Sequence, residues 1–302
     1  MYSLSQSYFV NERKIDEEYK ISQAMGQRSG VTFEQFQRAV QLWDMKNLPT
    51  NHSVFELDRN YFLQKGIPAN QKELPFCFVI PSYNNAGNDR YKKSLSSILM
   101  QEYSNYHIVY VDDHSTDGTL DKAAQFLKEM QFPAERATLL RNEKNMKATY
   151  SNMRGSKECK SGEIMVSLDG DDELLGRYVL KMINAKYHEG DYWLVYTNFI
   201  QSTLKFGNSK PVPKDFYNGP RRRLHIIGPV RTWYVDLYWK IKEEDHKTFA
   251  GEYFPALSDD VEQFPLLEMA GPKHVFYMTE ICLLYNRYSN NDDTHLYGIM
   301  LQ

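Results

Sequence analysis

Residues 76–81 read FCFVIP, and this short apolar run ended by a proline decides the fold class of the chain. A continuous run of this kind is typical of a strand buried on both faces of a sheet. The run IVYV at 108–111 repeats the pattern, and two more strand signals follow near 137–140 and 164–168. Stretches with helical spacing separate them. The alternation predicts an α/β fold, with a mostly parallel sheet flanked by helices.

The segment before this alternation has a different composition. Residues 1–73 are polar, with helical patterns near 11–25 and 32–44. In the second pattern Phe33, Phe36, Val40 and Trp43 fall on one helix face. We therefore expect a helical N-terminal extension over 1–73 that caps a main domain over 74–302.

Polar residues follow three of the predicted strands. They are Ser82-Tyr83-Asn84-Asn85 after the first, Asp112-Asp113 after the second and Asp169-Gly170-Asp171-Asp172 after the fourth. In parallel sheets ligands bind at the carboxyl ends of the strands, so these clusters should meet at one edge. Carboxylates that crowd together repel one another unless a cation lies between them, and oxygen ligands favour Mg²⁺ or Mn²⁺. The alternative is that these residues only form turns and helix caps, as we expect for Asp117.

Composition excludes several classes of protein. The chain is 42% hydrophobic and 25% charged, which is typical of a globular protein. Its net charge of −3 argues against nucleic acid as a partner. The basic triplet Arg221–Arg223 is a local exception, read either as a solvated loop or as a ligand-binding element. We expect no transmembrane segment, because no apolar stretch approaches the roughly 18 residues that a span needs.

The cysteines and the N-terminus bear on cellular location. Cys77, Cys159 and Cys282 have no paired spacing, which predicts neither a disulfide framework nor a zinc ligand set. The first residues lack the basic and apolar regions of a signal peptide. These features predict a reducing compartment, and hence a cytoplasmic protein that could act at a membrane surface only peripherally.

Four sequence blocks, taken in order, resemble the glycosyltransferases of family 2, which have the Rossmann-like GT-A fold. The blocks are VIPSYN at 79–84, SLSSILMQEY at 94–103, VDDHSTDGT at 111–119 and GEIMVSLDGDD at 162–172. The resemblance implies a nucleotide-binding half over 74–172 and an acceptor-binding half over 173–302. It implies metal-dependent transfer of a sugar from a nucleotide diphosphate donor, expected to be a UDP-sugar, to a hydroxyl of a glycan or another acceptor. It also implies inversion at the anomeric carbon.

The same resemblance assigns roles to particular positions. Residues expected to contact the base or ribose are Pro81, Tyr83, Asn84, Asp112, Asp113 and Asp169, with Asp113 reading the pyrimidine N3–H and Asp112 supporting it. In the Asp-x-Asp motif, Asp171 is the expected direct ligand of Mn²⁺ or Mg²⁺. Asp169 is expected near the ribose or the metal-bound water.

A general base is also required, because an acceptor hydroxyl is a poor nucleophile. The family places this acid before a late helix, which matches the segment SDDVEQFPLLEMAG at 258–271. Counting back from Gly271 favours Asp260, whereas counting from Glu268 favours Asp259, and both alternatives stay open. Pro265 suits the first turn of that helix, which would place the two acids just before it. The competing interpretation is that the pair only caps the helix.

Two other functions compete with the glycosyltransferase interpretation. A sugar-phosphate nucleotidyltransferase needs a glycine-rich basic loop after the first strand, and residues 82–86 offer none. A non-catalytic nucleotide-sugar-binding protein would not need the intact acidic motifs. Between those motifs, Arg221–Arg223 or His225 could clamp a diphosphate. The aromatic residues Trp233, Tyr234, Tyr238 and Trp239 could stack on a sugar or belong to the core.

Overall fold

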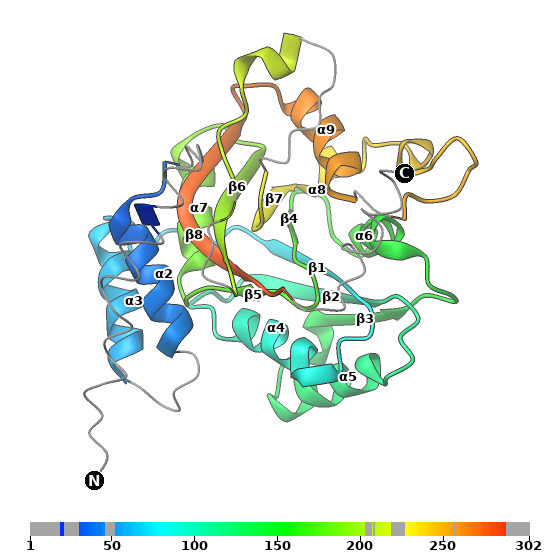
Figure 1. Ribbon diagram of the computed structural model, residues 1–302, viewed down its shortest axis with the longest axis horizontal. Coiled ribbons are helices and arrows are strands. Elements are labelled where there is room, and N and C mark those ends of the chain that lie inside the picture. The colour runs from blue at the N-terminus through cyan, green and yellow to red at the C-terminus, as the bar shows by residue number, and fades with distance from the viewer. Residues whose placement is uncertain are drawn as a thin grey trace.

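A computed structural model describes residues 19–20, 30–45, 52–202, 207, 209–218, 227–255 and 258–287. Its centre is an eight-stranded sheet in the order β3-β2-β1-β4-β7-β6-β8-β5 (Figure 1). The strands are β1 Phe76–Ser82, β2 Tyr106–Asp112, β3 Ala137–Arg141, β4 Ile164–Ser167, β5 Glu173–Leu174, β6 Leu194–Gln201, β7 Arg231–Tyr234 and β8 Val275–Tyr285. The α-helices are α2 Phe33–Met45, α3 His52–Gln64, α4 Arg90–Leu99, α5 Thr119–Glu129, α6 Lys147–Ser156, α7 Val179–Glu189, α8 Val235–Tyr238 and α9 Ser258–Ala270.

The first half of the sheet confirms the predicted alternation. Strands β3, β2, β1 and β4 run parallel to one another, and α4, α5 and α6 connect them in chain order. The second half is mixed, because β7 runs antiparallel to both β4 and β6 while β8 runs parallel to β6. The carboxyl ends of β1, β2 and β4 therefore share one edge, as the polar clusters after them require.

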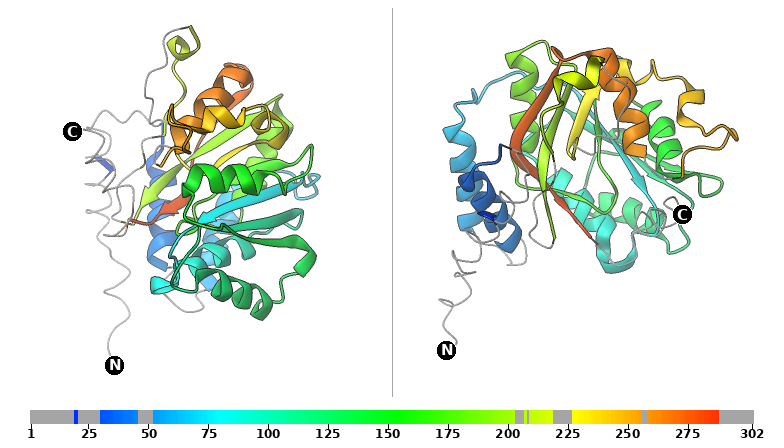
Figure 2. Two further views of the ribbon diagram at one scale, coloured as in Figure 1. Left: turned by 90° about the vertical axis from the view of Figure 1, so that its right-hand side faces the viewer. Right: turned by 45° about the horizontal axis from the view of Figure 1, so that its top comes forward.

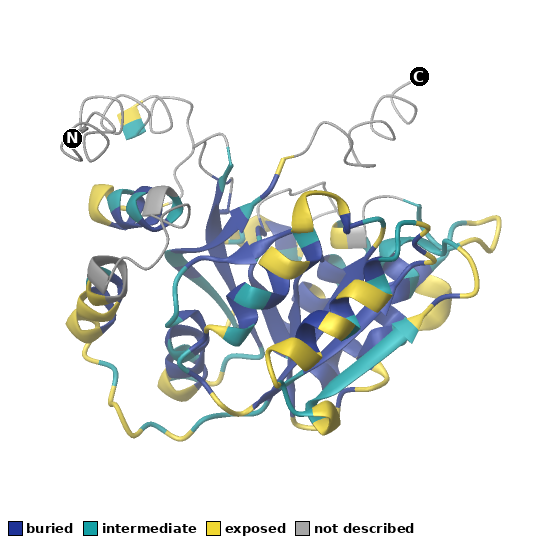
Figure 3. Cartoon of the chain, turned by 90° about the horizontal axis from the view of Figure 1, so that it is seen from below, coloured by how far each residue is buried: buried dark blue, intermediate teal, exposed yellow. Residues whose placement is uncertain are grey.

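Alternate residues of each central strand serve different faces of the sheet. Along β1, Phe76, Phe78 and Ile80 pack in one core cluster with residues of α4, α5 and α7. Cys77 and Val79 belong to a second cluster that includes residues of α8 and α9. Figure 2 shows α4 and α5 on one side of the sheet and α6 and α9 on the other. Figure 3 shows the central strands as a buried layer between helices whose outer surfaces are exposed, whereas the edge strand β3 is only partly buried.

Helix α6 lies unusually close to the sheet because of a glycine. A Cβ atom on Gly155 would come within 2.6 Å of a methyl group of Val79 and 3.0 Å of one of Val111. Real Cβ atoms essentially never come within 2.6 Å of another atom, so a larger residue would force the Val79 side chain, the strand or the helix to shift. The glycine fixes α6 directly over β1 and β2.

The N-terminal helices form a third layer beside β8 (Figure 1). The predicted helix near 32–44 is confirmed as α2, whose Phe36 and Val40 pack with Leu175 and Ile281. Helix α3 was not predicted. The pattern near 11–25 lies outside the described residues apart from 19–20. A buried ion pair between Arg38 and Asp58 joins the two helices.

Asp58 also ties this layer to the main sheet. Its second carboxylate oxygen accepts a hydrogen bond from the backbone N–H of Arg177, 2.6 Å away. Arg177 follows the Asp-x-Asp motif by a few residues. The N-terminal helices thus contact the segment that leaves the candidate site, although their division from residues 74–302 stays a prediction.

One sequence-based expectation about the cysteines is wrong. Cys77 and Cys159 form a disulfide, although 82 positions separate them in the chain. The close packing of α6 against β1 brings Cys159, which lies shortly after the helix, onto the start of the strand. Sequence spacing carries no trace of that contact. Cys282 is free and buried in β8.

None of the helices in the described part of the chain is both long enough and apolar enough to cross a membrane.

Candidate functional site

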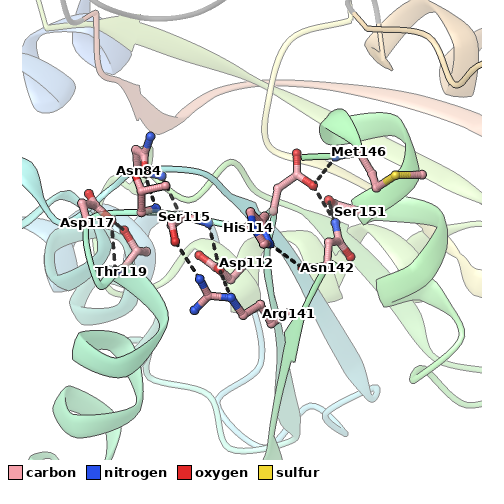
Figure 4. Close-up of polar contacts among 12 residues, drawn as sticks. Asn84, Asp112, His114, Ser115, Asp117, Thr119, Arg141, Asn142, Met146 and Ser151 are labelled. Carbon is pink, nitrogen blue, oxygen red and sulfur yellow. Dashed lines mark hydrogen bonds and ion pairs between the residues drawn. The ribbon is translucent and has the colours of Figure 1, made fainter. Parts of the chain in front are cut away.

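The site is built at the edge where β1, β2 and β4 end. After β1, Tyr83 is 37% exposed, and Asn84 adopts a left-handed backbone conformation with φ of 51°. The backbone N–H of Asn84 donates to the Ser115 hydroxyl at 2.9 Å, and its side-chain oxygen accepts the N–H of Thr116 at the same distance. These bonds join the loops after β1 and β2 (Figure 4). Pro81, inside β1, is buried.

The two acids after β2 are almost wholly enclosed. One oxygen of Asp112 accepts the backbone N–H of Ser115 at 3.1 Å and lies 3.8 Å from the Arg141 guanidinium. The other is buried, with no hydrogen-bond partner among the described residues. Asp112 thus organises the loop after β2, and its expected supporting role in nucleotide binding stays a prediction.

Asp113 holds the beginning of α6. One of its oxygens accepts the Met146 N–H and the Asn142 side-chain amide, each at 2.7 Å, and the other accepts the Lys147 N–H at 2.8 Å. A carboxylate has about four lone-pair sites, so three donors leave room for one more. The residue is therefore a helix cap in this structure, and its reading of a pyrimidine remains a proposal.

The Asp-x-Asp turn packs directly on the end of β1. The backbone N–H of Gly170 donates to the Pro81 carbonyl at 2.9 Å. A Cβ atom at this position would come within 2.8 Å of the Ser82 side chain and 2.9 Å of that carbonyl. Only glycine therefore allows Asp169 and Asp171 to flank β1 at this distance.

The third acid of the motif is structural. Asp172 is buried and accepts the backbone N–H of Asn286 at 2.9 Å. The Asn286 side chain in turn donates to the Asp171 carbonyl and to Glu173, at 2.8 and 2.9 Å. Burial raises the pKa of Asp172 well above its usual value, and the negative charges of Asp171 and Asp169 add to this rise. The acids of this turn are therefore close enough to repel one another.

An arginine joins this turn to the late acids. Both nitrogens of the Arg231 guanidinium fork bond the carboxylate of Asp259, at 2.5 and 2.7 Å. Burial lowers the pKa of Arg231, but the charges of Asp259 and Asp169 outweigh it and raise the pKa overall. Arg231 opens β7, which pairs with β4, whereas Asp259 lies in the first turn of α9. Arg231 is the register partner of Ser167, so it bonds Asp259 at a position beside the strand that leads into Asp169.

The beginning of α9 corrects a prediction. The helix starts at Ser258, so Asp259 and Asp260 lie inside its first turn and Pro265 lies in its interior. The sequence placed the start near Pro265 because proline favours a first turn. The helix tolerates the lost backbone hydrogen bond while Leu266 and Leu267 are fully buried in the core.

The acids at the ends of β2 and β4 both influence a buried tyrosine of β2. The Tyr110 hydroxyl, on β2, is hydrogen-bonded to that of Ser82 at 2.7 Å. Burial raises the pKa of Tyr110, and negative charges from both Asp112 and Asp171 contribute to the rise. The acid clusters after β2 and β4 therefore flank one tyrosine, as the shared edge predicts.

Comparison with known proteins identifies the family of the chain. A family model described as glycosyl transferase family 2 matches residues 77–239, more than half of the chain. The chain belongs to glycosyl transferase family 2.

Relatives of this family 2 chain include three bacterial proteins. A putative glycosyltransferase EpsE of Bacillus subtilis is 30% identical over 36% of the chain and 37% of its own length. The amylovoran biosynthesis glycosyltransferase AmsB of Erwinia amylovora is 28% identical over 47% of the chain and 48% of its own length. The Escherichia coli protein WfgD, named a UDP-Glc:alpha-D-GlcNAc-diphosphoundecaprenol beta-1,3-glucosyltransferase, is 29% identical over 40% and 47%. The matches thus span at most about half of these relatives.

Solved structures share the fold. Staphylococcus aureus TarS 1-349 in complex with UDP-GlcNAc has a TM-score of 0.52 at 17% identity, covering 72% of this chain and 60% of that one. The mannosyltransferase PcManGT of Pyrobaculum calidifontis, in complex with GDP-Man and Mn²⁺, has a TM-score of 0.50 at 17% identity and covers 88% and 72%. At such identities the likeness concerns the fold alone, and it confirms the GT-A prediction.

The family 2 chain contains two site residues that sequence reasoning missed. Arg231 lies between the two acidic motifs, two residues before Trp233, and the sequence analysis gave it no role. Glu262, one turn after Asp259, is buried and accepts hydrogen bonds from the Tyr238 hydroxyl at 2.9 Å and from the Asn152 amide at 3.3 Å. Burial raises its pKa to about 8. The only signal for Glu262 in the sequence was its position three residues after Asp259, which places the two acids on the same face of a helix.

The remaining expectations fall in the segment before α9. Trp233 and Tyr238 are buried and stacked, with ring centroids 5.9 Å apart, so they belong to the core of the family 2 domain. Arg221–Arg223 and His225 lie outside the described residues. Nδ1 of His114 lies 3.2 Å from the Asn142 carbonyl oxygen.

Proposed function

We propose that the chain is a metal-dependent glycosyltransferase that transfers a sugar from a UDP-sugar to an acceptor hydroxyl with inversion. The observation that carries this proposal is the position of Arg231, which pairs in register with Ser167, two residues before Asp169, and holds Asp259 through both nitrogens of its fork. Asp169, from the middle of the chain, and Asp259, from near its end, therefore belong to the same edge of the sheet. A transferase needs its donor site and its acceptor site side by side in this way.

The acidic turn has the properties of a divalent-cation site. Its ligands would be carboxylate oxygens of Asp171 and Asp169, which suit Mn²⁺ or Mg²⁺. The raised pKa of Asp172, due to burial and then to these two neighbours, indicates negative charge that a cation would offset. When bound, such a metal stabilises the charge that develops on the departing nucleoside diphosphate. The Mn²⁺ complex of PcManGT supports this assignment.

We assign the nucleotide to the ends of β1 and β2. Tyr83 is exposed enough to contact a base or ribose, whereas Asn84 and Asp112 use their polar atoms mainly to hold the loops together. Asp113 keeps one lone-pair site for a base N–H. The name of WfgD and the UDP-GlcNAc complex of TarS both support uridine as the nucleotide.

We assign the general base to Asp260. Both oxygens of Asp259 are engaged by Arg231, and a carboxylate held by a guanidinium fork is a weaker proton acceptor. In the proposed step the Asp260 carboxylate takes the proton of the acceptor hydroxyl. The oxygen attacks the anomeric carbon on the face opposite the leaving diphosphate. Asp259 and Arg231 act as positioning residues for the first turn of α9.

A donor screen tests the proposal. The purified chain is incubated with UDP-, GDP- and TDP-sugars, with Mn²⁺ and with chelator, and release of free nucleotide is measured. We expect Mn²⁺-dependent release from one or a few UDP-sugars. Release of no nucleotide and no binding to any nucleotide sugar would instead favour a non-catalytic chain. The cytoplasmic location stays a prediction, against which the Cys77–Cys159 disulfide weighs.

A further inference from the structure

A second cluster of metal-binding side chains lies at the opposite edge of the sheet. Cys77, His107 and Glu163 each offer a ligand atom, and these three atoms lie within 4.8 Å of one another. Cys159 is bonded to Cys77 and therefore brings a fourth. No other group of three such residues is this compact in the part of the chain that the structure describes.

The backbone fixes all parts of this cluster. Cys77 and His107 are direct register partners near the beginnings of β1 and β2, so their side chains leave the sheet on the same face. Glu163 immediately precedes β4, and one of its carboxylate oxygens lies 2.9 Å from Nε2 of His107. The same oxygen accepts the Lys160 N–H at 2.7 Å. Two of the ligand atoms thus come from paired strands, and hydrogen bonds hold the carboxylate of Glu163 beside them.

The surroundings suit a small buried ion. Cys77 is fully buried, and Cys159 and Glu163 are nearly so, whereas His107 is partly exposed. Two sulfurs, one imidazole and one carboxylate are the ligand types of tetrahedral zinc sites, with bonds of about 2.0–2.3 Å. Oxygen-only sites select Mg²⁺ or Mn²⁺ instead, so this cluster and the Asp169–Asp171 turn would take different metals.

We infer that, once the Cys77–Cys159 disulfide is reduced, these two thiolates, His107 and Glu163 form a zinc site. Reduction by a phosphine gives the two sulfurs two electrons and leaves two thiols, while the phosphorus takes an oxygen from water and becomes a phosphine oxide. The metal then replaces the two thiol protons, which pass to solvent. The disulfide and the zinc site are alternative links between β1 and the residues after α6.

Both links would act on the same helix. Asp113 holds the first residues of α6, and Cys159 holds the segment that follows its last turn. In a reducing compartment the disulfide would be lost. A metal would then preserve the attachment of α6 to the sheet.

Cobalt is the probe for the test, because Co²⁺ occupies zinc sites and thiolate ligands give it a strong near-ultraviolet charge-transfer band. The full chain is reduced with a phosphine, freed of metal and titrated with Co²⁺. We expect one equivalent to bind with this band, and Zn²⁺ to displace it. The oxidised chain should show no band. Reduced chain without a thiolate band at saturating Co²⁺ would overturn the inference.

Variants identify the ligands. Cys159→Ser should abolish the band, and His107→Gln and Glu163→Gln should each weaken Co²⁺ binding at least tenfold, as expected for loss of one ligand. Cys282→Ala is the matched control, since it removes the other buried thiol and should leave the band intact. A band that survives Cys159→Ser, or that tracks Cys282, would reject the site. Because His107 and Glu163 are not core apolar residues, their variants remain informative if Cys159→Ser fails to fold.

This inference is independent of the proposed transferase activity. Asp171→Asn should leave the thiolate band unchanged, because oxygen ligands cannot produce it. Loss of the band in Asp171→Asn would mean that the titration reports the other metal site.

Discussion

The guanidinium of Arg231 and the carboxylate of Asp259 form a two-point ion pair, with N–O distances of 2.5 and 2.7 Å, between β7 and the first turn of α9. Bidentate pairs of this kind fix orientation as well as charge. The pair therefore sets the direction in which α9 begins, and with it the position of Asp260. The ion pair also gives Asp259 a different environment from Asp260, two acids that the sequence alone could not distinguish.

Asp260→Asn should lower kcat by about 10²–10⁴-fold, the usual range for loss of a general base. Asp259→Asn is the matched comparison. Because it removes a positioning charge and not the proton acceptor, its loss of kcat should be at least tenfold smaller. Steady-state transfer rates at saturating donor measure both. Equal losses, or a larger loss in Asp259→Asn, would reverse the assignment.

Asp171→Asn should abolish Mn²⁺-dependent turnover while the chain stays folded, because it removes the proposed direct ligand. Asp121→Asn, at an exposed position in the first turn of α5, is the control and should behave as the unchanged chain. Circular dichroism checks the fold, and donor hydrolysis across a Mn²⁺ titration checks the metal. Unimpaired metal-dependent turnover in Asp171→Asn would rule out the mechanism.

Gly170→Ala should displace the Asp-x-Asp turn, because the added methyl group would come within 2.8 Å of the Ser82 side chain. We expect a loss of stability of about 1–3 kcal/mol from overpacking, together with a fall in activity larger than in any variant of comparable stability. Gly87→Ala is the control, since a Cβ atom there meets no atom within 4 Å. Urea unfolding and initial rates are the measurements. Normal activity in Gly170→Ala would show that the turn need not lie so close to β1.

Glu262→Gln should change how stability depends on pH. Burial raises the pKa of Glu262 from 4.5 to about 8, so between these values the folded state keeps a proton that the unfolded state has lost. The stabilising contribution is therefore complete below pH 4.5 and is lost as pH rises towards 8, by up to about 1.4 kcal/mol per pH unit. The glutamine variant lacks this titration. Its midpoint of thermal unfolding should fall less between pH 5 and 8 than that of the unchanged chain, and parallel curves would contradict the assignment.

Asp58→Ala should destabilise the chain by about 3–5 kcal/mol, because it leaves the buried Arg38 guanidinium without its partner. It also removes the acceptor of the Arg177 N–H. Glu56→Ala, at an exposed position of α3, should change stability by less than about 0.5 kcal/mol. Urea unfolding measures both. A small effect of Asp58→Ala would mean that the N-terminal helices unfold separately from the sheet.

The sequence by itself determined the parallel half of the sheet and the acidic clusters at its carboxyl edge. Runs such as 76–80 and 108–111 are short, apolar and rich in aromatic and β-branched residues, which favours a buried strand, and residues that follow parallel strands share an edge. These are local rules, so a single chain is enough to apply them. The four sequence blocks around these strands also predicted the family.

Only the tertiary structure decided which partner each polar group meets. The fork of Arg231 on Asp259, the capping of α6 by Asp113 and the pairing of Cys77 with Cys159 all join residues far apart in the chain. Such contacts depend on how strands and helices stack, and periodicity within a segment does not encode them. The start of α9 shows the same limit, because burial of Leu266 and Leu267 outweighed the local preference of Pro265.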